Sequence, residues 1–171
     1  MRRMISAAAG IVLSGIALAQ TPPSGPAAEV QGSYARIKVN VMKAAENMPA
    51  ENYAFKPTPD IRTFARVVNH VTEAQYRNCG SMNHLDPIPK PPADTADKAA
   101  IVEALKASFA ECDKAYAALT DANLTEMIQA GPVKRSRIGL SWGNVSHDNE
   151  QYATLALYMR LKGLVPPSSE K

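Results

Sequence analysis

The positions of the prolines constrain the fold of this chain more than any other sequence feature. All thirteen prolines lie between, or at the ends of, long segments that contain none. A proline inside a helix costs about 3 kcal/mol, so these positions mark breaks between helices. After Pro26, four long proline-free windows remain, at residues 27–48, 60–86, 93–131 and 133–165.

Each window has the apolar spacing of an amphipathic helix over part of its length. In the first window the stripe alternates steps of four and three: Val30, Tyr34, Ile37, Val41, Ala44 and Met48. We expect the second helix to begin beside Asp60, the third at Asp94 or Thr95, and the fourth to stop at Gly163. No segment shows convincing alternation of period two. The pattern therefore predicts an all-α protein, a four-helix bundle.

The first 19 residues are typical of a secretory signal peptide. Arg2 and Arg3 precede a mostly apolar run, and Ala17-Leu18-Ala19 fits a small-x-small cleavage site. The run is shorter than the about 20 residues that span a bilayer, which favours a cleaved signal over an uncleaved anchor. We therefore expect a periplasmic or secreted protein. Its parts are a signal peptide at 1–19, a flexible tail at 20–27, a bundle domain at 28–165 and a C-terminal tail at 166–171.

The charge of the chain gives no reason to expect a nucleic-acid partner, or a membrane partner after signal cleavage. The chain has 19 Lys and Arg and 16 Asp and Glu, a net charge of +3. Loss of Arg2 and Arg3 with the signal peptide leaves 17 basic and 16 acidic residues, which is close to neutral. The one dense basic segment, Lys134–Arg137, is interpreted as a solvated loop before a helix. Dimers are common among soluble helical bundles, so a homodimer is one of the assemblies that the sequence allows.

The fourth window places polar side chains on the face that a bundle buries. On a helical wheel Gln151 falls inside the apolar face and His147 on its edge, and Asn144 and Asp148 also project toward it. Burying such groups without partners costs about 1–3 kcal/mol each, so they need a metal, water or one another. Ligand and metal sites of helical bundles are often built from such side chains.

The chain has two further histidines. His84 lies in a proline-rich connection, and we do not expect it to be a ligand. His70 lies in the second window, nearly opposite its main apolar stripe, so its local pattern is that of a surface or boundary residue. Glu73, one turn further on, is either a solvated carboxylate or an acceptor for an imidazole N–H.

Three segments resemble the DinB-like family of bacterial four-helix-bundle proteins. They are RTFARVVNHVTEAQYRNC (62–79), IVEALKASFAECDKAY (101–116) and HDNEQYATLALYMRLKGLVPPSS (147–169). The resemblance implies an up-down-down-up bundle and a metal site of three histidines, one from the second helix and two, four residues apart, from the last. By position, these ligands correspond to His70, His147 and Gln151.

The third position departs from the family pattern because it is an amide. Imidazole nitrogen is a strong ligand for zinc and nickel, whereas a carboxamide oxygen is a poor one. We therefore expect a divalent-metal site, for zinc or nickel, that Gln151 weakens or makes degenerate.

Three functions remain open. The resemblance implies a metal-dependent thiol transferase or hydrolase. The alternatives are a non-catalytic exported bundle that binds a small ligand or a protein partner, and a purely structural domain. No GxSxG, Walker A, CxxC or HExxH motif supplies another catalytic centre. The substrate remains unassigned.

Cys79 and Cys112 both fall on apolar stripes. Two buried thiols would fit this position, whereas export favours oxidation to a disulfide. Antiparallel second and third helices would hold the cysteines about 20 Å apart. The parallel order that the resemblance implies places them at the same level. That order predicts a disulfide that closes a loop of about 30 residues and is worth about 3 kcal/mol.

Overall fold

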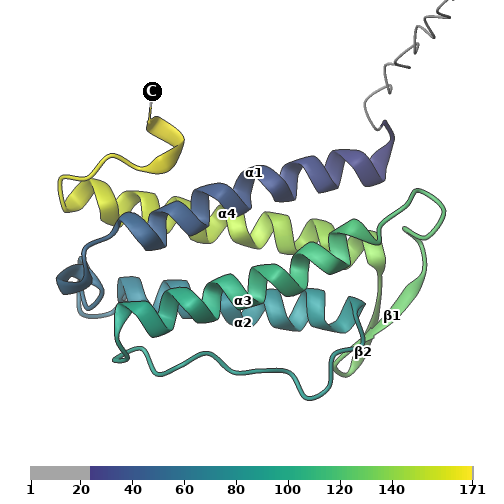
Figure 1. Ribbon diagram of the computed structural model, residues 1–171, viewed down its shortest axis with the longest axis horizontal. Helices are drawn as coiled ribbons and strands as arrows, with labels where there is room; N and C mark the ends of the chain where they lie inside the picture. The colour runs from purple at the N-terminus through teal and green to yellow at the C-terminus, as the bar shows by residue number, and fades with distance from the viewer. Residues whose placement is uncertain (1–23, 171) are drawn as a thin grey trace, which may run out of the picture.

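Four helices form the body of the protein and confirm the predicted bundle (Figure 1). The structure is a computed structural model that describes residues 24–170, so the expected signal peptide at 1–19 lies outside the described residues. The first and fourth helices run in one direction and the second and third in the other, which is the up-down-down-up order. The helices are α1 (Pro26–Asn47), α2 (Phe64–Met82), α3 (Lys98–Ala117) and α4 (Arg137–Leu161).

Two helices begin later than predicted. α2 starts after Thr63, whose extended backbone and side-chain oxygen cap the first turn, and not beside Asp60. α3 starts after Asp97 and not at Asp94 or Thr95. Asp94 instead accepts a hydrogen bond from α2, at 2.8 Å, and so belongs to the connection that precedes α3.

The structure contains a short β-hairpin that the apolar pattern does not predict. β1 (Met127–Ala130) pairs antiparallel with β2 (Val133–Ser136). Gly131, at φ 61°, and Pro132 make the turn between them. Each strand has four residues and only Ile128 is buried, so no alternation can develop. The interpretation of 134–137 as a loop is therefore wrong, because these residues complete β2 and begin α4.

Two short 3₁₀ helices complete the fold, at Ala50–Asn52 and Pro167–Ser169. The second belongs to a C-terminal segment that packs against the bundle. There the backbone N–H of Ser168 donates to the Tyr152 hydroxyl at 2.8 Å, and Lys43 pairs with Glu170 at 2.8 Å. None of the helices in residues 24–170 is both long and apolar enough to cross a bilayer.

The long connection at 83–97 runs back along the bundle, so that α2 and α3 are parallel (Figure 1). Asn69, fully buried on α2, holds this connection in place. Its side-chain nitrogen donates to the Pro92 carbonyl at 3.0 Å and to Asp94 at 2.8 Å. Asn69, which anchors the connection, is the residue directly before His70 on α2.

The parallel order brings Cys79 of α2 and Cys112 of α3 to the same level. Their Cα atoms lie 4.9 Å apart, and a disulfide joins them. Both residues are fully buried. The disulfide lies next to the side chain of Gln75, whose Oε1 contacts the sulfur of Cys112.

Candidate functional site

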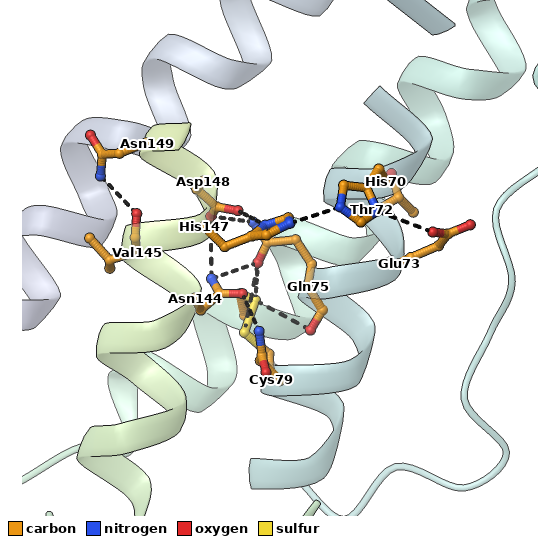
Figure 2. Close-up of polar contacts among 12 residues, drawn as sticks. His70, Thr72, Glu73, Gln75, Cys79, Asn144, Val145, His147, Asp148 and Asn149 are labelled. Atoms are coloured by element: carbon orange, nitrogen blue, oxygen red, sulfur yellow. Dashed lines mark hydrogen bonds and ion pairs between the residues drawn. A yellow bond between two sulfur atoms is a disulfide. The ribbon is translucent and has the colours of Figure 1, made fainter. Parts of the chain in front are cut away.

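His70 of α2 and His147 of α4 face each other where these two helices pack (Figure 2). Their Nε2 atoms are 3.1 Å apart, and the two rings meet edge to face at 67°. Each side chain is 21% exposed, so the pair lies at the rim of the bundle and is open to solvent on one side. The structure thus turns His70 toward His147, as the family resemblance implies and its local pattern does not.

A carboxylate lies behind each imidazole, on the side away from the other ring (Figure 2). Nδ1 of His70 is 3.5 Å from Glu73, and Nδ1 of His147 is 3.7 Å from Asp148. These separations are long for hydrogen bonds, yet they place negative charge beside both Nδ1 atoms. Arg66 holds Glu73 in position with two hydrogen bonds, at 2.7 and 2.9 Å.

A buried polar network fixes Asp148. One carboxylate oxygen accepts hydrogen bonds from the side-chain nitrogens of Gln75, at 2.8 Å, and Asn144, at 3.3 Å. Asn144 also donates to the oxygen of Gln75 at 3.1 Å. All three residues are fully buried. The inward direction predicted for Asn144 and Asp148 is therefore correct, and one oxygen of Asp148 is satisfied by the side chains of Gln75 and Asn144.

Three atoms of this site lack hydrogen-bond partners within the described residues: Nδ1 of His70, Nδ1 of His147 and the second oxygen of Asp148. The last two face each other at 3.7 Å. A carboxylate and an imidazole N–H at this separation need only a small movement to form a hydrogen bond. The site can therefore tighten around His147 without a change in the fold.

The environment shifts the pKa of two groups at this site. Burial raises the pKa of Asp148 to about 6, although His147 and Gln75 partly oppose the shift. Burial also lowers the pKa of His70, and the charges of Arg62 and His147 lower it further. The His70 imidazole is therefore kept in its neutral form, which is the form that binds a metal.

Gln151 lies one turn beyond His147 and is 5% exposed, so it faces inward as predicted. Within residues 24–170 its amide forms no hydrogen bond, and no group of three or more His, Cys, Asp or Glu is arranged to hold a metal ion. Gln151 instead lines a surface pocket of about 390 Å³ together with Val67 of α2. The structure thus pairs two of the three predicted ligands and leaves the third beside them.

Sequence patterns alone did not identify Gln75 or Arg66 as parts of this site. Gln75 is a polar residue on a broadly buried helix and gives no local signal. Arg66, His70 and Glu73, in contrast, are spaced by four and three residues, which places them on one face of a helix. That spacing could have revealed the ion pair behind His70.

The buried carboxylate makes the stability of the protein depend on pH. Because the pKa of Asp148 rises from 3.8 to about 6 on folding, its ionisation costs the folded state stability as pH rises through this range. We expect Asp148→Asn, which keeps an oxygen acceptor for Gln75 and Asn144, to remove about 2–3 kcal/mol of that cost at pH 7.5. Urea unfolding in EDTA at pH 4.0 and 7.5 measures the effect.

The same variant at pH 4.0 is its own control, because Asp148 is then largely protonated in the folded state and only about half ionised in the unfolded state, so little of the cost has accumulated. A change of stability that is equal at the two pH values would show that ionisation of Asp148 is not the cause.

Comparison with known proteins identifies the family. The model of the DinB superfamily matches residues 34–155, a span that includes both histidines and Gln151. No curated protein matches the chain. The fold resembles that of a DinB-like protein from Bacillus subtilis, with a TM-score of 0.64 at 16% identity, over 79% of this chain and 92% of that one.

Two further structures show the same fold. A DinB-like protein from Bacillus cereus has a TM-score of 0.65 at 16% identity, over 81% of this chain and 93% of that one. A conserved protein from Enterococcus faecalis has a TM-score of 0.64 at 13% identity, over 81% of this chain and 98% of that one. With a family model that covers most of its length, the chain belongs to the DinB superfamily.

Proposed function

We propose that this protein binds a divalent metal ion, zinc or nickel, through His70 and His147 and uses it in a transfer or hydrolysis reaction. The observation that carries the proposal is the 3.1 Å separation of the two Nε2 atoms. Two nitrogens at 2.0–2.1 Å from one ion, at ordinary ligand angles, lie about 2.9–3.4 Å apart. The two imidazoles are therefore spaced as ligands of a single ion.

The carboxylates behind the rings support the same proposal. Glu73 and Asp148 favour a proton on each Nδ1, which leaves the two Nε2 lone pairs directed at each other. Lone pairs in this arrangement repel unless a metal ion or a proton lies between them, and the proton would make the contact an N–H···N hydrogen bond. Burial and the charge of Arg62 lower the pKa of His70 and so disfavour the proton.

The residues around the two histidines would orient the imidazole rings of such a centre. Asp148, held by Gln75 and Asn144, orients the ring of His147, and the Arg66–Glu73 pair does the same for His70. A metal ion held there would polarise a substrate oxygen or lower the pKa of a bound water or thiol.

Metal titration of the metal-free protein by calorimetry tests the proposal. We expect one zinc or nickel ion per chain, and an affinity about a hundredfold lower after His147→Ala or His70→Ala, because each imidazole supplies one strong ligand bond. His84→Asn is the matched control, since His84 lies beyond the end of α2 and asparagine tolerates its positive φ of 56°. Absence of stoichiometric binding, or equal losses in His147→Ala and His84→Asn, would contradict the proposal.

A second candidate function is ligand binding without catalysis. The observation that favours it is the buried network of Asp148, Gln75 and Asn144, which is satisfied at one carboxylate oxygen without any ion. The amide at position 151, where the family resemblance implies histidine, points the same way. In this case the protein keeps the fold and the pocket but takes up no stoichiometric metal in the same titration.

We also propose that the mature protein acts in an oxidising compartment, the periplasm or the exterior of the cell. The residues typical of a signal peptide support this, as does the Cys79–Cys112 disulfide, since such bonds persist mainly in oxidising compartments.

A further inference from the structure

The pocket beside Gln151 begins one helical turn from the histidine pair. Gln151 follows His147 by four residues on α4, and Val67 precedes His70 by three on α2. The two helices run in opposite directions, so both steps lead toward the same end of the bundle (Figure 1). One turn of helix is about 5 Å, which brings a small molecule in this pocket within reach of the paired Nε2 atoms.

The pocket has charges of both signs that do not neutralise one another. Arg62 lines it, and within the described residues its guanidinium forms neither an ion pair nor a hydrogen bond. Asp60 and Glu150 also line the pocket, and their carboxylates are likewise without an ion pair in residues 24–170. The backbone of Arg62 is fixed, because the Tyr158 hydroxyl donates to its carbonyl at 2.9 Å.

The pocket also has an apolar wall that solvent reaches. Ile61 and Leu157, which are 41% and 53% exposed, both line it. Val67, almost fully buried, adds a third apolar side chain. A hydrocarbon group placed against this wall would remove apolar surface of both the ligand and the protein from water, which favours binding.

From these features we propose that the pocket binds a small molecule that carries both a carboxylate and an amino group on an aliphatic body. The carboxylate binds Arg62, the amino group binds Asp60 or Glu150, and the aliphatic part covers Ile61 and Leu157. Two acidic residues disfavour a dianion such as phosphate, and Arg62 disfavours a simple cation. That this pocket holds the substrate of the dihistidine centre rests on the proposed function; the binding itself does not.

Three related probes test the charge requirement in the metal-free protein. L-Leucine carries both charges, N-acetyl-L-leucine lacks the amino charge and L-leucinamide lacks the carboxylate. In ¹H–¹⁵N NMR titrations we expect leucine to shift the amides of Ile61, Glu150 and their neighbours. We expect it to bind at least about tenfold more tightly than either analogue, since each analogue loses one charged contact.

Arg62→Gln isolates the proposed carboxylate anchor. We expect this variant to bind leucine about tenfold more weakly. Arg77→Gln should leave leucine binding unchanged. It is the matched control because Arg77 is also an exposed arginine, on α2 outside the pocket, and its side chain forms no ion pair within the described residues.

Three outcomes would overturn the proposal: no leucine-dependent shifts, equal binding of N-acetyl-L-leucine and leucine, or equal losses in the two arginine variants. A zinc titration of the same samples separates this inference from the proposed function. Leucine binding without zinc binding retains the pocket and rejects the metal centre. Zinc binding without leucine shifts does the reverse.

Discussion

Replacing Gln151 with histidine is expected to raise the affinity of the protein for zinc or nickel by about 10²–10³-fold. Structural zinc sites with four ligands bind with about 10–16 kcal/mol, or about 3–4 kcal/mol for each strong ligand. Because 1.4 kcal/mol is a factor of ten, one added imidazole accounts for the expected gain. Gln151 is 5% exposed and lies one turn from His147, so a histidine there shares the face of α4 that carries the first ligand.

Gln151→Ala is the control that separates a weak ligand from a bystander. If the amide coordinates no metal, the alanine variant binds zinc as the natural protein does, and only the histidine variant gains. If the amide is a true ligand, the natural protein already binds tightly, the alanine variant loses affinity and the histidine variant gains little. Competition against a chromophoric chelator measures all three proteins on one scale.

Thermal unfolding with and without EDTA shows whether the new histidine acts in the folded protein. Metal binding to the folded state raises its stability by an amount that grows with the ratio of metal concentration to dissociation constant. EDTA should therefore lower the melting temperature of Gln151→His more than that of the natural protein. A Gln151→His variant that folds, yet matches Gln151→Ala in zinc affinity, would show that position 151 cannot reach the ion.

The number and type of the helices followed from the sequence because proline and apolar spacing act locally. Each break and each stripe is a property of one segment. The relative direction of α2 and α3 is not, since an amphipathic stripe packs equally well against a parallel or an antiparallel neighbour. The parallel direction was predicted from the family resemblance alone. The connection at 83–97, which makes it possible and which Asn69 anchors, has no periodic sequence pattern.

The candidate site was predictable in part for the same reason. Asn144, His147, Asp148 and Gln151 all lie on α4, so one helical wheel relates them. His70 was ambiguous because α2 packs against both α3 and α4, which widens its buried face beyond a single stripe. A wheel drawn for α2 alone cannot show which edge of that face meets α4.

The role of the short loop before α2 was also beyond local patterns. Ile61 continues the apolar spacing of Phe64 and Val68 toward the N-terminus, yet the helix begins after Thr63 and Ile61 is 41% exposed. An apolar residue just before a helix can have the same spacing as the buried residues within it. Sequence periodicity therefore does not distinguish the two cases. In the structure that residue instead borders the pocket that Arg62 lines.

Removal of the disulfide is expected to lower the free energy of unfolding by about 4 kcal/mol. Cys79 and Cys112 are separated by 33 residues, and closing a loop of that length restricts the unfolded chain by about 3.7 kcal/mol. The bond ties α2 to α3 across the long connection at 83–97, and both cysteines are fully buried. A double Cys79→Ala, Cys112→Ala variant adds a small packing loss to this term.

Urea unfolding of the natural protein and of the double variant, each with and without dithiothreitol, separates the cross-link from the packing. Reductant should lower the stability of the natural protein by most of the 4 kcal/mol and leave the variant unchanged. Ser108→Ala is the matched packing control: Ser108 is buried on α3 one turn from Cys112, and among residues 24–170 its hydroxyl bonds only the Leu105 carbonyl, at 2.7 Å. Its cost should be about 1 kcal/mol and should be the same in either buffer. A natural protein that reductant does not destabilise under unfolding conditions would show that the two cysteines are free thiols in solution, and the parallel pair of helices would then be held by packing alone.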